Sequence, residues 1–70
     1  MDRTVTVRVV GGDTQEVAVG DDATYTDLLR AVGRTSHDAT ALVGGRPVPA
    51  DAPVEAGTEE VEVLKLVVGG

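Results

Sequence analysis

The sequence contains no cysteine, and this absence removes several kinds of chemistry. Without thiols the chain can form no disulfide, and it offers no thiolate as a nucleophile or a zinc ligand. One histidine, His37, is too few for the usual zinc-binding spacings. No hydrophobic run approaches the roughly 20 residues of a membrane-spanning helix, and the polar, alternating N-terminus shows no secretion signal. We therefore expect a cytoplasmic protein with no membrane partner.

Basic residues are also scarce, because the chain has 6 Lys and Arg against 12 Asp and Glu, a net charge of −6. An acidic surface repels phosphates, which argues against nucleic acid as a partner and favours a basic protein. Only one of the bases is a lysine, a balance that resembles the proteins of salt-loving archaea. High salt would screen the repulsion between carboxylates. The alternative is an ordinary acidic surface.

No group of residues in the sequence has the pattern of a catalytic site. His37 could act as a general base held by Asp38, but a solvated turn histidine is the simpler interpretation, because no activated nucleophile has an evident place beside it. The acidic pairs 21–22 and 59–60 lack metal-ligand spacing, and no Gly-Gly pair precedes the Lys-Ser/Thr of a phosphate loop. We expect a substrate or carrier rather than an enzyme, with no catalytic residue, no metal and no bound cofactor.

Seventy residues form one small domain, and its hydrophobic pattern predicts an α+β fold. Alternation of apolar and polar residues, with turn signals between the runs, is typical of half-buried strands. The predicted strands cover residues 3–9, 15–19, 39–43, 46–48 and 60–68. We expect a mixed sheet of four to five strands with one short helix across one face and water on the other.

The predicted helix follows residue 24. Thr24 is a plausible N-cap, Asp27 can interact with the free N–H groups of the first turn, and Gly33 suits the left-handed position that ends a helix. Spacing of i, i+3, i+4 and i+7 gives the helix one apolar stripe. The stripe consists of Tyr25, Leu28, Leu29 and Val32.

Three leucines outside the helix do not fit the core. Successive side chains of a strand point to opposite faces of the sheet, and the valines and alanines of these strands are expected to face the core. This alternation places Leu42, Leu64 and Leu66 on the other face. Leucines exposed together would form an apolar patch of the kind that binds a protein partner. Alternatively, a bulge near Val63 reverses the phase and buries Leu64 and Leu66.

The last four residues are Val67, Val68, Gly69 and Gly70. Because glycine has no Cβ, a Gly-Gly segment can thread a narrow channel and present its carboxylate for activation. The other Gly-Gly pairs, at 11–12 and 44–45, lie between predicted strands and suit turns. Chance or a cloning remnant is the alternative for the last pair. We expect residues 67–70 to form a flexible tail behind a domain of residues 1–66.

Several segments resemble the ubiquitin-like small archaeal modifier proteins over essentially the whole chain. They are the helix at 25–32, the Gly-Gly-Arg-Pro-Val-Pro segment at 44–49, the apolar strand at 61–68 and the final Gly69-Gly70. The final motif is shared with the bacterial sulfur carriers of molybdopterin and thiamine synthesis. The resemblance implies a ubiquitin-like β-grasp domain at 1–66.

The resemblance also implies a mechanism. An E1-like enzyme would use ATP and Mg²⁺ to adenylate the carboxylate of Gly70, with Gly69 beside it. A target lysine would then form an isopeptide bond, or sulfur would give a thiocarboxylate for tRNA thiolation or molybdopterin. Implied partners are the E1-like enzyme, target proteins and a desampylating-type metalloprotease, all acting on a monomer. Val67 and Val68 match tail positions loosely, and the leucines Leu42, Leu64 and Leu66 match a ubiquitin-like recognition patch in placement.

Two alternatives and one further residue remain open. The chain could instead be a dedicated sulfur-donor small subunit of a molybdopterin-synthase-type enzyme, or a plain interaction domain with an inert tail. Lys65 is the only lysine, so it is a possible acceptor for chains of the modifier. Its simpler role is to cover apolar surface with its stem while its charge stays in water.

Overall fold

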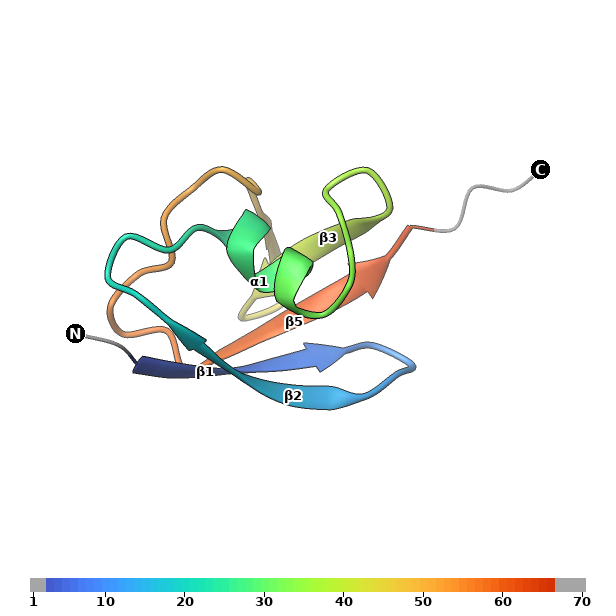
Figure 1. Ribbon diagram of the computed structural model, residues 1–70. Coiled ribbons are helices and arrows are strands. Elements are labelled where there is room, and N and C mark those ends of the chain that lie inside the picture. Colours follow the sequence, from blue (N-terminus) through green and yellow to red (C-terminus); the bar gives the residue numbers. More distant parts are fainter. Residues whose placement is uncertain (1–2, 67–70) are drawn as a thin grey trace.

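The computed structural model describes residues 3–66 of the chain. These residues form five strands and one helix, joined by turns and loops (Figure 1). In chain order they are β1 (Arg3–Val9), β2 (Thr14–Val19), α1 (Tyr25–Ala31), β3 (Ala39–Val43), β4 (Arg46–Val48) and β5 (Glu60–Lys65). The strands form one sheet in the order β2-β1-β5-β3-β4. Only the pairing of β1 with β5 is parallel, so the sheet is mixed. The predicted α+β architecture is confirmed.

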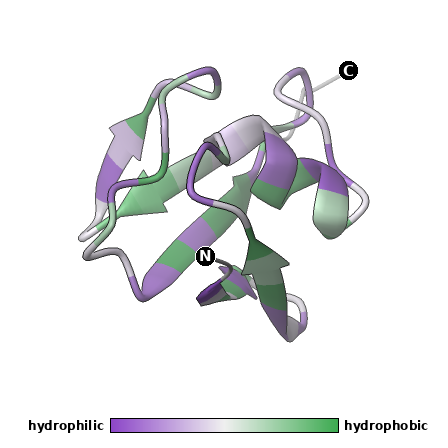
Figure 2. Ribbon diagram, turned by 60° about the vertical axis from the view of Figure 1, so that its left-hand side comes forward, coloured by the Kyte–Doolittle hydropathy of each residue, from purple (hydrophilic) through white to green (hydrophobic). Residues whose placement is uncertain are grey.

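The core lies between the sheet and α1, which crosses one face of the sheet (Figure 1). Strand alternation appears as bands of opposite hydropathy along the ribbon in Figure 2. The largest fully buried side chains are Val5, Val7, Leu28, Leu29, Val61 and Val63. Burying apolar area provides most of the driving force of folding, and here small β-branched residues supply most of it.

Helix α1 begins and ends as its sequence predicts. The backbone N–H of Thr24 donates to Oδ2 of Asp27 at 2.9 Å, which joins the N-cap to the third helical residue. At the other end, Gly33 has a φ of +76° and donates its N–H to the carbonyl of Arg30. Seven residues are too few for an independent helix, so its stability depends on packing against the sheet.

Arg3 connects the start of β1 to the long loop before β5. Its guanidinium donates to the carbonyls of Val54 at 2.9 Å, Ala56 at 3.1 Å and Thr58 at 2.9 Å. A guanidinium has five donors in a fixed fork, so one side chain satisfies three carbonyls of a loop that lies outside the sheet. This contact fixes the loop that leads into β5.

The structure differs from the predicted strand ends. β2 begins at Thr14 instead of Gln15, and β5 ends at Lys65 instead of Val68. After Lys65, the N–H of Leu66 still donates to the carbonyl of Asp38 at 2.9 Å, but β3 begins only at Ala39. The strand ends where its partner does. The predicted tail, residues 67–70, lies outside the described residues.

Within residues 3–66, no helix is both long enough and apolar enough to cross a bilayer.

Candidate functional site

The outer face of the sheet, away from α1, carries the leucines that alternation excluded from the core. Strands β3 and β5 pair without a bulge, from Leu42 opposite Glu62 to Ala39 opposite Lys65. The predicted alternative, a bulge near Val63 that buries Leu64 and Leu66, is therefore wrong. Leu64 is 41% exposed and Leu66 is 46% exposed. Their predicted exposure is confirmed.

The predicted exposure of Leu42 is wrong, because its side chain is half-buried and contributes less to this surface than Leu64 and Leu66. Its direct partner across the sheet is Glu62, while Leu64 lies opposite Thr40. Leu42 and Leu64 are consequently diagonal neighbours, a relation in which residues lie about 7–8 Å apart, their Cβ atoms somewhat closer, and large side chains still reach each other. The prediction of adjacent leucines holds for this pair.

Val10 joins the leucines and was missed by the sequence analysis. It is 43% exposed, and its N–H donates to the carbonyl of Val63 at 2.9 Å, next to Leu64. The sequence could have predicted this exposure. Thr6 and Arg8 lie on the outer face of β1, and the same alternation, continued one residue past the end of the strand, places Val10 on that face. We call the surface formed by Val10, Leu42, Leu64 and Leu66 the leucine face.

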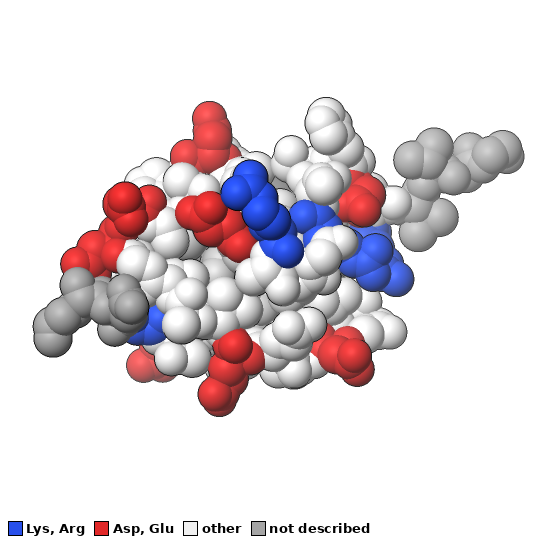
Figure 3. All heavy atoms as spheres, in the orientation of Figure 1, with Lys and Arg blue, Asp and Glu red and all other residues white. Residues whose placement is uncertain are grey.

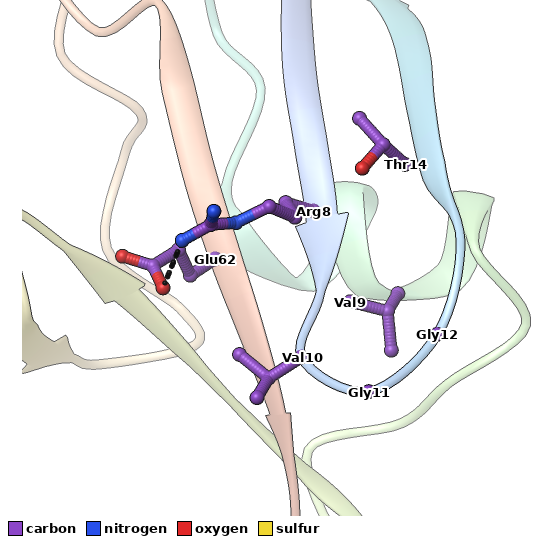
Figure 4. A pocket seen from close by; sticks show the side chains of 7 residues that line it. All are labelled: Arg8, Val9, Val10, Gly11, Gly12, Thr14 and Glu62. Atoms are coloured by element: carbon purple, nitrogen blue, oxygen red, sulfur yellow. Dashed lines mark hydrogen bonds and ion pairs between the residues drawn. The ribbon is translucent and has the colours of Figure 1, made fainter.

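A hollow of about 330 Å³ borders the leucine face at the turn between β1 and β2 (Figure 4). Its lining residues are Arg8, Val9, Val10, Gly11, Gly12, Thr14 and Glu62. Arg8 of β1 lies beside Glu62 of β5, and its guanidinium donates to Oε2 of Glu62 at 2.9 Å. This hydrogen bond and the carboxylate charge raise the pKa of Arg8 above its ordinary value. The ion pair gives the apolar surface a polar edge without a net charge.

The C-terminal end of β5 is held by the turn before β3. The carboxylate of Asp38 accepts a hydrogen bond from the N–H of Thr35 at 2.8 Å, and the Asp38 carbonyl accepts the N–H of Leu66. The bond from Thr35 is the main cause that lowers the pKa of the Asp38 carboxyl, and Arg34 adds a smaller effect. His37 is exposed and Asp38 is engaged with Thr35, which disfavours a general base in this turn.

Lys65 is exposed beside this turn, on the opposite side of the sheet from Leu64. It pairs with the buried Ala39, so it lies on the same face of the sheet as the core valines of β5. Val67, Val68, Gly69 and Gly70 lie outside the described residues. The structure thus places Leu64, Leu66 and Lys65 together at the end of β5, and it leaves the proposed tail residues undescribed.

Charge is unevenly distributed over the surface. In the view of Figure 3, acidic side chains dominate the left-hand edge, and basic side chains lie mainly at the centre and right, toward the end of β5. Among residues 3–66, no group of three or more His, Cys, Asp or Glu could hold a metal ion. Acidic side chains that lie close together on the surface repel one another.

Raising KCl from low to molar concentration should raise the melting temperature, because screening weakens the repulsion among 12 acidic side chains. Circular dichroism melting curves at several KCl concentrations measure the effect. A variant carrying Asp51→Asn and Glu55→Gln removes two exposed charges and should depend less on salt. A melting temperature that stays constant or falls with KCl would contradict this account of the acidic surface.

Comparison with known proteins gives concordant results. The family model of small archaeal modifier protein 2 matches residues 3–67. The chain is 58% identical over 66 residues to small archaeal modifier protein 2 of Haloferax volcanii, covering 94% of this chain and 97% of that protein. The crystal structure of the H. volcanii protein matches with a TM-score of 0.74 at 61% identity, over 77% of this chain and 82% of that chain.

A more distant match concerns the fold alone. Caldiarchaeum subterraneum ubiquitin matches over 100% of both chains with a TM-score of 0.75 at only 16% identity. The mixed five-stranded sheet with one short helix is therefore a ubiquitin-like fold. Together with the family match over almost the full length, this places the chain in the small archaeal modifier protein 2 family.

Proposed function

We propose that this chain is a protein modifier whose Gly70 carboxylate is adenylated by an E1-like enzyme and then joined to lysine amines of target proteins. The observation that carries the proposal is the 58% identity to a small archaeal modifier protein over 94% of the chain. A modifier is a ubiquitin-like carrier on which other proteins act, and it is not itself an enzyme. The Gly69-Gly70 segment supplies the group to be activated.

The chemistry explains why activation is needed. A carboxylate is a poor electrophile, so the Gly70 oxygen first attacks the α-phosphate of ATP, with Mg²⁺ as the enzyme's cofactor, and releases pyrophosphate. In the resulting acyl-adenylate, AMP is a good leaving group. A neutral lysine amine then attacks the acyl carbon, the C–N bond forms, and AMP departs with the electron pair. Because neither glycine has a Cβ, the enzyme's backbone can approach the reacting carbon closely.

The reach of the chain suggests where the enzyme docks. The four residues after Leu66 span at most about 14 Å when fully extended. An enzyme that holds Gly70 must therefore contact the surface close to Leu66. We propose that the leucine face forms the apolar centre of this contact and that Val67 and Val68 continue it. The Arg8–Glu62 ion pair lies at its polar edge, as at other interface rims.

The same acyl-adenylate could accept sulfur instead of an amine. Attack by hydrosulfide on the acyl carbon would form the C–S bond, release AMP and leave a thiocarboxylate, which could donate sulfur for tRNA thiolation or molybdenum cofactor synthesis. No observation on residues 3–66 favours a dedicated sulfur-donor subunit over a modifier. We therefore include sulfur carriage as a second use of the activated carboxyl group.

Mass spectrometry of cell lysate tests the proposal directly. Trypsin cleaves after Lys65, so it should leave Leu-Val-Val-Gly-Gly remnants branched on the lysines of target proteins, and a protease that cleaves after Val68 should leave Gly-Gly. The free protein should be examined at the same time for a C-terminal thiocarboxylate. Thiocarboxylate without any branched remnant would contradict the modifier and support the dedicated sulfur donor.

The variant Leu64→Ser should weaken the E1-like enzyme's affinity for the protein and raise the KM in pyrophosphate exchange about fivefold or more. Leu64 projects from the outer face and is not part of the core, so the melting temperature should change little. Glu60→Gln is a matched control on the same face of the same strand, four residues away. An unchanged KM for Leu64→Ser would remove the leucine face from the docking surface.

A further inference from the structure

Lys65 lies where β5 ends, one residue before the last described hydrogen bond of the chain. It is the only lysine in the sequence, and its side chain is exposed. Its partner Ala39 is buried under the helix side of the sheet, whereas Leu64 lies opposite Thr40 on the outer face. Lys65 thus presents a primary amine beside the base of the proposed tail, on the side away from the leucine face.

The distance between this amine and the proposed reactive carboxyl group is limited by the chain itself. Gly70 follows Lys65 by five residues, which span at most about 17 Å. A compact domain of this length is about 28 Å across, according to the size scaling of globular proteins. A protein joined to Lys65 is therefore wider than the whole segment that an activating enzyme must hold.

We propose that Lys65 is a modification site and that a copy of this protein joined to it hinders activation of the Gly70 that follows it. The inference rests on the proposed function, since it concerns access to the same carboxyl group. The acceptor is the amine of Lys65, and the donor is the adenylated Gly70 of a second copy. The C–N bond forms at the donor's acyl carbon, AMP leaves, and the amine's protons pass to solvent.

This arrangement fixes the order in which chains of the modifier grow. A copy whose Lys65 is occupied is activated slowly, so preformed chains compete poorly with free copies for transfer to a target. Chains therefore grow mainly by single additions of free copies to the exposed Lys65 of the outermost copy. The leucine face lies on the other side of the sheet, so it stays available to partners that do not need the tail.

The test uses two isopeptide-linked dimers. In the first, a donor copy carrying Lys65→Arg is joined through its Gly70 to Lys65 of an acceptor copy. In the second, the acceptor carries Lys65→Arg and Arg46→Lys, and the donor is joined at position 46. Arg46 is exposed and pairs with Val43, which lies four positions along β3 from Ala39, the partner of Lys65. A lysine at position 46 therefore lies on the same face of the sheet as Lys65 but far from the end of β5. The two acceptors have the same net charge.

ATP–pyrophosphate exchange is measured with the E1-like enzyme encoded in the same genome. The donor's carboxyl group is consumed in the isopeptide bond, so exchange reports only the acceptor's Gly70. We expect the dimer joined at Lys65 to exchange about tenfold more slowly than the dimer joined at position 46. The position-46 dimer should stay within twofold of its free acceptor, and melting curves should show both dimers folded.

A difference of less than threefold between the dimers would overturn the inference while leaving the proposed function intact. Failure of the free, unlinked protein to exchange would instead contradict the proposed function and, with it, this inference. In cells that carry only Lys65→Arg, bonds that join one copy of the modifier to another should disappear, while single copies joined to target lysines remain. Chains that persist through the α-amine of Met1 would show that Lys65 is not the acceptor.

Discussion

Deletion of Gly69 and Gly70 is expected to abolish adenylation while leaving the melting temperature within about 2 °C of the full chain. The deletion removes the proposed reacting carboxyl group and the two residues without a Cβ beside it. It removes no core residue of the described structure, whose last buried side chain is Val63. ATP–pyrophosphate exchange measures the first effect, and circular dichroism melting measures the second.

A control keeps the length of the chain while changing its chemistry. Replacing both residues, Gly69→Ala and Gly70→Ala, retains a C-terminal carboxylate but adds two Cβ atoms to the segment. If a narrow channel selects the tail, this variant should exchange far more slowly than the unaltered chain. Undiminished exchange by the protein that lacks Gly69 and Gly70 would contradict the proposed function.

Leu28→Ala is expected to lower the free energy of unfolding by about 2–5 kcal/mol, the usual range for truncating a buried leucine. Leu28 is fully buried between α1 and the sheet. At about 0.05–0.15 kcal/mol per residue, a domain of this size has only about 4–10 kcal/mol of stability. The variant should therefore be partly unfolded at low salt, as measured by urea titration at fixed KCl.

Leu64→Ala is the matched comparison, because the same side chain is removed from the outer face. We expect a cost well below that of Leu28→Ala, since Leu64 is 41% exposed in the folded state whereas Leu28 is fully buried. Equal losses for the two variants would mean that Leu64 packs as a core residue and that the leucine face does not exist as described.

The sequence was sufficient for most of the fold because the strands alternate strictly. Val5, Val7, Val61 and Val63 repeat with a period of two, and they are all buried. The same alternation predicted the exposure of Leu64 and Leu66. Helix α1 followed from a single apolar stripe and from residues with clear capping roles.

The features that the sequence did not predict depend on partners far away in the chain. The end of β5 is set by where β3 begins, which no local pattern near Lys65 can indicate. Arg3 bonds to carbonyls 51 to 55 residues away, and nothing in the alternation of β1 marks that side chain as a donor to the loop. Val10 was missed because the strand pattern was stopped at Val9 before the turn glycines.

The position of β5 at the centre of the sheet has a consequence for the synthesis of the protein. β5 is the last strand of residues 3–66, yet it alone joins β1 to β3 in the sheet. A nascent chain cannot close its sheet until residues 60–65 have left the ribosome, and a chain cut short before them lacks the strand that joins its two halves. Such fragments would expose both halves of the core and be open to proteolysis. We therefore expect that copies which escape proteolysis have been translated through β5, to within a few residues of the glycines on which the proposed activity depends.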